Sequence, residues 1–371
     1  MRKLFLFLLV ALVALVTACS NSASTNEQTD EKTDQQATNE DESKESDKKA
    51  EKKNEEKEVA QPFEALAPSE DAKPLKETMT EEELAKMPVV EAHGEDRTRK
   101  TPVGETLMEG TTDETDGILK DYRLVAYYGQ PNSTKMGILG EMEPEALMTK
   151  LKEQTQAYSD ADPDRPAIPT IELITTIAQR EPGPNGKYYH MTSEEDIDEY
   201  AELAKKHNAI LMLDVQLGRD TALHQVQLLE KWLKLPYVHV AIDTEFHVKE
   251  GQTPGIDLGS VDGSEVQEVV DYVSKFVEEN NLPDKIVLVH QFTDHAVTNK
   301  QVIKPTDNVE VALNFDGYGD YGTKMSLYRK FVRNEPVQYG GFKIFYNKDK
   351  PVLTPAEVLQ LDPNPAIINY Q

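Results

Sequence analysis

Eight short apolar runs alternate with helical segments between residues 122 and 371, and this alternation constrains the fold most strongly. Most of the runs are continuously apolar, as expected of parallel strands that are covered on both faces. Eight strands alternating with helices over about 250 residues predict a (β/α)8 TIM-type barrel. The predicted strands are Leu124–Tyr128, Ile171–Gln179, Ile210–Gln216, Val238–Glu245, Ile286–Gln291, Val309–Asp316, Gly341–Tyr346 and Ile367–Tyr370.

Helix-start signals lie in the gaps between these strands. Ser264 and Gln267 have the spacing of a capping box, and the valines that follow share one face of a helix. Thr354 and Pro355 place a cap and a first-turn proline before another helix, and Ser193 starts a third. Two further helices are predicted over residues 145–157 and 223–235.

A doubly wound open sheet is the alternative fold, and it is less favoured because no glycine-rich turn follows the first strand. In the given sequence, Gln371 follows the eighth strand directly, where a barrel ordinarily continues into an eighth helix. We expect a short helix at about 81–87 or a partner to cover that position, unless it stays open. Two long loops, Arg180–His190 and Lys249–Gly263, are candidates for shaping a cleft.

The first eighteen residues have the form of a secretory signal. Two basic residues precede an apolar run from Leu4 to Val16, which is too short to span a bilayer. Small residues then precede Cys19, and this pattern resembles the signal of bacterial lipoproteins. The resemblance implies removal of residues 1–18 and lipidation of Cys19, which would anchor the chain to the extracytoplasmic face of the cell membrane. An uncleaved anchor with an incidental Cys19 is the alternative.

Residues 19–117 are predicted to be a disordered tether, because their polar composition cannot bury enough apolar surface to offset ordering entropy. Thr80 begins a capping-box pattern, so the tether includes the possible short helix at about 81–87. The predicted barrel domain therefore covers residues 118–371. The net charge of −27 argues against nucleic acid and anionic membrane surfaces as partners. The single cysteine excludes an internal disulfide.

Polar residues end most of the predicted strands, and the carboxyl ends of barrel strands line the functional site. Carboxylates there suit acid–base chemistry, amides suit hydroxyl groups, and aromatic faces suit sugar rings, so we predict a glycan ligand. The predicted catalytic acids are Glu245, Asp243, Asp214 and Asp316. The predicted substrate-binding residues are Tyr127, Tyr128, Gln179, Gln216, His290, Gln291, Asn314, Tyr346 and Tyr370.

The segment Asp243-Thr244-Glu245 resembles the end of the fourth strand in chitinase-like and muramidase-like glycosidase barrels. That resemblance implies that Glu245 protonates the glycosidic oxygen and that Asp243 assists through the substrate's acetamido group. As alternate residues of a strand, the two would face the same side, with Cα atoms roughly 6.5–7 Å apart. The chain departs from the first family at residues 240–242, which are apolar, and from the second at Tyr127, where an acid is usual.

Two other interpretations of the acids remain open. Asp243 and Glu245 could be structural partners of Lys343 or Arg219. The acids could instead hold a divalent metal together with His290. A histidine without a ligand-spacing motif is more often a core residue, so we predict neither metal nor cofactor.

Residues 122–371 also resemble a group of bacterial surface lipoproteins. The similar stretches are Tyr127–Gly129, Leu213–Gln216, His290–Phe292 and Gly340–Lys343. This resemblance supports one coherent domain and implies no activity. We therefore predict a lipid-anchored barrel that acts on a cell-envelope or environmental glycan, possessing glycoside hydrolase activity if it is an enzyme. The alternative is a non-catalytic glycan-binding or scaffold lipoprotein.

Overall fold

The structure, a computed structural model, describes residues 61–80, 82 and 98–371, which belong to one compact unit. The predicted signal segment, Cys19 and all of the predicted helix at 81–87 except Glu82 lie outside the described residues. Within the described ranges, no helix is both long and apolar enough to cross a bilayer.

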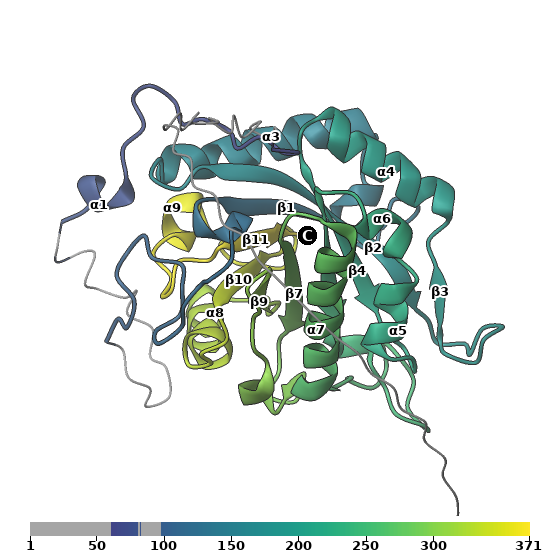
Figure 1. The fold of residues 1–371 in the computed structure, drawn as a ribbon. Coiled ribbons are helices and arrows are strands. Elements are labelled where there is room, and N and C mark those ends of the chain that lie inside the picture. Colours follow the sequence, from purple (N-terminus) through teal and green to yellow (C-terminus); the bar gives the residue numbers. More distant parts are fainter. Residues whose placement is uncertain (1–60, 81, 83–97) are drawn as a thin grey trace, which may run out of the picture. The chain divides into compact units, whose positions relative to one another are not determined.

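Eight parallel strands in the described part of the chain close into a barrel, which confirms the predicted (β/α)8 architecture (Figure 1). The hydrogen-bonded order is β1-β11-β10-β9-β7-β5-β4-β2, and pairing between β2 and β1 completes the circle. The strands are β1 (Arg123–Gly129), β2 (Ala167–Ala178), β4 (Ile210–Gln216), β5 (Val238–Asp243), β7 (Lys285–Gln291), β9 (Val309–Phe315), β10 (Tyr339–Ile344) and β11 (Ile367–Tyr370).

Helices surround the barrel and cover its apolar outer face (Figure 1). They are α3 (Pro144–Ala161), α4 (Glu194–Lys206), α5 (Ala222–Gln227), α6 (Glu230–Leu233), α7 (Gly263–Asn280), α8 (Tyr321–Tyr328) and α9 (Pro355–Val358), and α1 (Leu75–Thr78) precedes them. Thr354 and Glu357 form a capping box at α9, and Ser193 caps α4, both as predicted. The predicted cap of α7 is wrong, because Asp262 accepts a hydrogen bond from the backbone N–H of Ser264.

Three short strands add to the barrel. β3 (Tyr189–Met191) runs antiparallel to β2, so the predicted loop Arg180–His190 is the connection of a hairpin. β6 (Val261–Asp262) and β8 (Val297–Thr298) pair with each other beside the barrel. The second long loop, Lys249–Gly263, therefore ends in β6, which leads directly into α7.

The outer face of β11 is covered by elements on either side of it. α3 and α9 contact each other there. The hydroxyl groups of Tyr158 on α3 and Tyr370 on β11 lie 2.7 Å apart, and Tyr346 donates a hydrogen bond of 3.0 Å to Gln154 of α3. Within the described residues, packing between α3 and α9 thus covers the position that the eighth helix of a barrel usually takes.

The described part of the predicted tether packs against the amino-terminal ends of the strands. Leu66 pairs with Ala167 at the start of β2, and Leu107 pairs with Tyr339 at the start of β10. The backbone N–H of Thr101 donates to Asp362, 2.9 Å away. Residues 61–80 and 98–117 therefore belong to the folded unit, which begins before the predicted boundary at residue 118.

Candidate functional site

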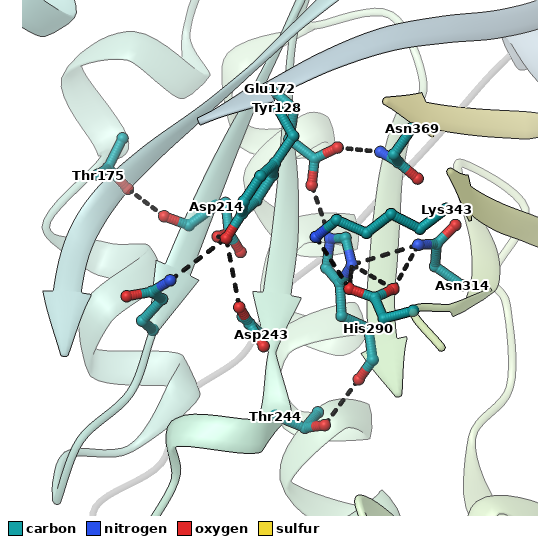
Figure 2. Close-up of polar contacts among 12 residues, drawn as sticks. Tyr128, Glu172, Thr175, Asp214, Asp243, Thr244, His290, Asn314, Lys343 and Asn369 are labelled. Carbon is teal, nitrogen blue, oxygen red and sulfur yellow. Dashed lines mark hydrogen bonds and ion pairs between the residues drawn. The ribbon is translucent and has the colours of Figure 1, made fainter. Parts of the chain in front are cut away.

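Each of the eight barrel strands contributes a buried polar side chain to the barrel interior (Figure 2). Residues that pair in register on parallel strands face the same side of the sheet. The pairs Tyr128 with Glu172 and Asp243 with His290 therefore point inward together. The eight side chains are those of Tyr128, Glu172, Asp214, Asp243, His290, Asn314, Lys343 and Asn369.

His290 is the centre of this interior network (Figure 2). Its Nδ1 lies 2.9 Å from both carboxylate oxygens of Asp316, and its Nε2 lies 2.6 Å from Glu172 Oε1. Burial lowers the pKa of His290, but the charges of Asp316 and Glu172 outweigh burial and raise that pKa well above its usual value. The side chain is therefore an imidazolium between two carboxylates, which requires both nitrogens to donate.

Asp316 is held as a carboxylate by two cations. Besides His290, the Nζ of Lys343 donates to Asp316 Oδ2 at 3.0 Å, and Asn314 Nδ2 donates to Asp316 Oδ1 at 2.6 Å. Burial alone would raise the pKa of Asp316, but His290 and Lys343 lower it to about 2. Lys343 also lies 3.6 Å from the centre of the Tyr128 ring, a cation–π contact. Asp316 is consequently ionised throughout the physiological pH range.

Asp214 and Asp243 form a second, protonatable pair beside this ion network. The hydroxyl of Tyr128 lies 3.2 Å from Asp214 Oδ2 and 3.4 Å from Asp243 Oδ2, and Gln216 Nε2 donates to that hydroxyl at 3.2 Å. Burial raises the pKa of Asp243 to about 7, and the charge of Glu245 adds to the effect. Burial and the nearby Asp243 raise the pKa of Asp214 as well. Near neutral pH, this pair therefore binds protons that free carboxylates would have lost.

A cleft with a volume of about 460 Å³ opens above the interior network. Glu245 and Asp316 both line it, and Tyr128, Gln216 and Lys343 lie at its base. Its lining also includes Lys135, Met136, Ile174, Phe246, Leu258, Phe292, Tyr318, Phe345, Lys348 and Gln371. The cleft thus combines carboxyl groups with aromatic surfaces, the combination that the sequence predicted for a sugar ligand.

Glu245 lies on a 3-10 turn over Thr244–Phe246 and not on a strand. β5 ends at Asp243, and the hydroxyl of Thr244, the next residue, donates a hydrogen bond to the carbonyl of His290 at 2.6 Å. The expected strand alternation of Asp243 and Glu245 is therefore wrong. The Glu245 carboxyl has no hydrogen-bond or ion-pair partner among the described residues. Burial, followed by the charge of Asp316, raises its pKa.

Five of the predicted substrate-binding residues lie away from both the cleft and the ion network beneath it. Because side chains alternate along a strand, Tyr127 and Gln291 face outward while their neighbours Tyr128 and His290 face inward. Gln291 donates to the carbonyl of Phe331 at 2.7 Å. Tyr346 and Tyr370 form an aromatic cluster with Tyr127 and with Tyr158 of α3. Gln179 contacts His190 in the hairpin after β2.

Tyr128, Gln216, His290 and Asn314 do reach the predicted location. Tyr128 and Gln216 line the cleft, while His290 and Asn314 lie beneath it and hold Asp316. Their positions assign no ligand to the cleft. Asp214 and Asp243 are buried beneath the cleft and do not line it.

Two members of the network were not predicted from the sequence. Glu172 interrupts the apolar run of β2, and Asn369 of β11 donates to its carboxylate. The predicted site residues come from the ends of the predicted strands, whereas Glu172 lies near the middle of β2. A lone acid inside an otherwise apolar, fully covered strand is the signal that identifies such a residue, because an unpaired buried charge is too costly to retain.

A divalent metal has one possible position among the described residues. Glu172, Asp214 and His290 each offer a ligand atom, and the three atoms lie within 4.8 Å of one another. Both nitrogens of His290 already contact carboxylates, however, and a metal ligand requires a nitrogen without a proton. Binding a metal there would require His290 to leave Glu172. We therefore assign the cluster as an ion-pair network.

Two carboxyl groups in one cleft have pKa values shifted in opposite directions, upward for Glu245 and downward for Asp316. One therefore suits proton donation and the other suits stabilisation of positive charge. The chain matches no protein-family model and no curated protein, so function has to be argued from this geometry.

Proposed function

We propose that the protein hydrolyses glycosidic bonds, with Glu245 as the general acid and Asp316 as the ionised carboxylate. The observation that carries the proposal is the opposite pKa shift of these two groups within one cleft. Glycosidases ordinarily use one carboxylic acid to protonate the leaving oxygen and one carboxylate on the other side of the bond. The site supplies both groups, and only Glu245 lacks a partner that would compete for its proton.

In this mechanism Glu245 protonates the glycosidic oxygen as the bond breaks. Asp316 stabilises the positive charge that develops on the sugar and orients the attacking water. His290 and Lys343 keep the Asp316 carboxyl ionised. The resemblance to glycosidase barrels pointed to Asp243 as the second carboxylate. Asp243 is only 3% exposed and lies beneath the cleft, so Asp316 takes that role in the proposal.

The pH dependence of kcat/KM tests this assignment. The reaction needs Glu245 protonated and Asp316 ionised, so the rate falls as pH rises through the raised pKa of Glu245. On the acid side, the rate falls only as pH approaches the Asp316 pKa of about 2. We expect maximal activity at acidic pH and no alkaline fall in the residual rate of Glu245→Gln. A rate that rises with pH between about 5 and 8 would contradict the proposal.

A non-catalytic glycan-binding protein is the second candidate. It is favoured by the pairing of Asp316, since both of its oxygens contact cations and such contacts also occur in purely structural networks. The two candidates differ at Glu245, for which a structural role offers no partner. Saturable binding of a glycan without any product would favour this second candidate.

We further propose that the chain is anchored to the outer face of the cell membrane through lipid on Cys19. The apolar run Leu4–Val16 followed by small residues and Cys19 supports this location. Replacing Cys19→Ser should move the protein from the membrane fraction to the medium, or leave its signal uncleaved, with no acyl mass on the chain. Ser20→Ala serves as the matched control and should remain membrane-bound. Acylated, membrane-bound Cys19→Ser protein would refute the anchor.

A further inference from the structure

Two lysines in the cleft form no close ion pair with any described residue, although the charge of Lys348 acts on Glu245 and partly offsets the burial that raises the pKa of that carboxyl. Lys135, in the turn after β1, and Lys348, after β10, both line the cleft and are exposed. Neither forms an ion pair with a described residue. The chain has 67 acidic and 40 basic residues, so acidic partners are abundant elsewhere. Because both lie in one cleft, these two lysines are available to the same external anion.

The position of Lys348 is set by aromatic rings. Its Nζ lies 4.5 Å from the ring centre of Tyr318 and 5.0 Å from that of Phe345. The two rings pack edge to face with centres 5.6 Å apart, and Phe345 is buried. Aromatic faces attract a cation without neutralising its charge. Lys348 is therefore held at the cleft while its charge stays available.

The third lysine of the cleft shows the contrast. Lys343 is buried and its charge is balanced by Asp316, which it contacts at 3.0 Å. Lys135 and Lys348 have no such contact. Their charges therefore make the cleft mouth positive, and of the described residues there, Glu245 is the one acid that is not paired with a cation. Tyr318 lies beside Lys348 with 59% of its surface exposed, which leaves an open aromatic face for a sugar ring.

We propose that the cleft recognises an anionic glycan, with Lys135 and Lys348 contacting a carboxylate or phosphate group on a sugar unit. Charge-assisted hydrogen bonds from ammonium groups to such anions are about twice as strong as neutral ones. The inference specifies the substrate of the proposed hydrolase and in that respect rests on the proposed function. Recognition of the anion does not itself need turnover, so the two can be tested separately.

The test is calorimetric binding to the Glu245→Gln chain, which retains the cleft and does not consume the probe. The matched probes are a peptidoglycan tetrasaccharide with free lactyl carboxylates, its methyl ester, and neutral chitotetraose. A glycerol-phosphate polymer with sugar substituents tests phosphate as the source of the anion. We expect the free acid to bind about tenfold more tightly than the ester, or the phosphate polymer to bind in its place.

Lysine variants identify where the anion binds. Lys348→Met and Lys135→Met should each abolish most of the preference for the charged probe and leave affinity for the ester unchanged. Lys234→Met, an exposed lysine after α6, is the matched control and should keep the preference. Raising ionic strength should weaken binding of the charged probe alone.

The outcomes separate the two proposals. Equal binding of acid and ester with no phosphate binding, no binding of any probe, or a preference that survives both lysine variants would overturn the inference. Lysine-dependent binding of an anion, with no product from the same glycan in the unmodified chain, would uphold the inference and remove the hydrolase proposal.

Discussion

Replacing Lys343→Met should lower the free energy of unfolding by about 3 kcal/mol, because breaking a buried ion pair leaves a charge that burial penalises. Lys343 and Asp316 are 4% and 12% exposed, and their contact is 3.0 Å long. Methionine fills a similar volume without the ammonium, so the loss reflects charge more than packing. Urea denaturation of both chains at the same pH measures the difference.

The control for this prediction is Lys348→Met, which changes an exposed lysine in the same cleft and should alter stability by no more than about 0.5 kcal/mol. The double variant Lys343→Met with Asp316→Asn should recover part of the loss, since the uncompensated carboxylate is then absent. Equal stability of Lys343→Met and the unmodified chain would show that His290 alone satisfies Asp316.

Replacing Glu245→Gln should reduce kcat on a natural glycan by about 10²- to 10⁴-fold, the usual contribution of a general acid. Glutamine keeps the shape of the side chain and has no proton to transfer. The loss should be much smaller for an aryl glycoside with a good leaving group, because such a leaving group departs without protonation. Steady-state rates on the two substrate types measure this difference.

Glu250→Gln is the matched control, since it makes the same chemical change at an exposed position five residues along the chain. It should retain the full rate on both substrates. An equal loss for Glu245→Gln on the natural and the aryl substrate would indicate a positioning effect and not proton donation.

The barrel was predictable because each of its strands is a local pattern. All eight predicted strands overlap the observed ones, and the predicted boundaries of Ile210–Gln216 and Ile367–Tyr370 coincide with those of β4 and β11. Where the prediction failed, the chain makes a long-range contact. After Asp243, the Thr244 hydroxyl donates a hydrogen bond to the carbonyl of His290, which the pairing of β5 with β7 brings next to it.

Which side chains meet inside the barrel was only partly predictable. Adjacent polar residues such as Tyr127 and Tyr128 look equivalent in sequence, and only the register of the sheet decides which one faces inward. The space available to a side chain inside the barrel also depends on residues that are distant in sequence. A Cβ atom on Gly341 would lie 2.2 Å from Asn314 Oδ1, so the absence of a side chain on β10 allows Asn314 of β9 to reach Asp316.

The electrostatics of the site likewise depend on tertiary structure. The sequence places several acids at strand ends, and crowding of carboxyl groups generally raises the pKa of at least one of them. The sequence did not predict that His290 and Lys343 would lower the pKa of Asp316 to about 2, because these residues lie on different strands and meet only in the barrel interior. The opposite shifts that support the proposed function therefore became visible only with the structure.

The most direct measurement is release of soluble products from peptidoglycan and chito-oligosaccharides by the chain from Ser20 onward, with Glu245→Gln and Glu250→Gln beside it. Residues 61–117 are retained because their described parts pack against the barrel. The proposed hydrolase predicts product from the unmodified chain and from Glu250→Gln, and almost none from Glu245→Gln. Undiminished release by folded Glu245→Gln, or no release by the folded unmodified chain from either glycan, would contradict it.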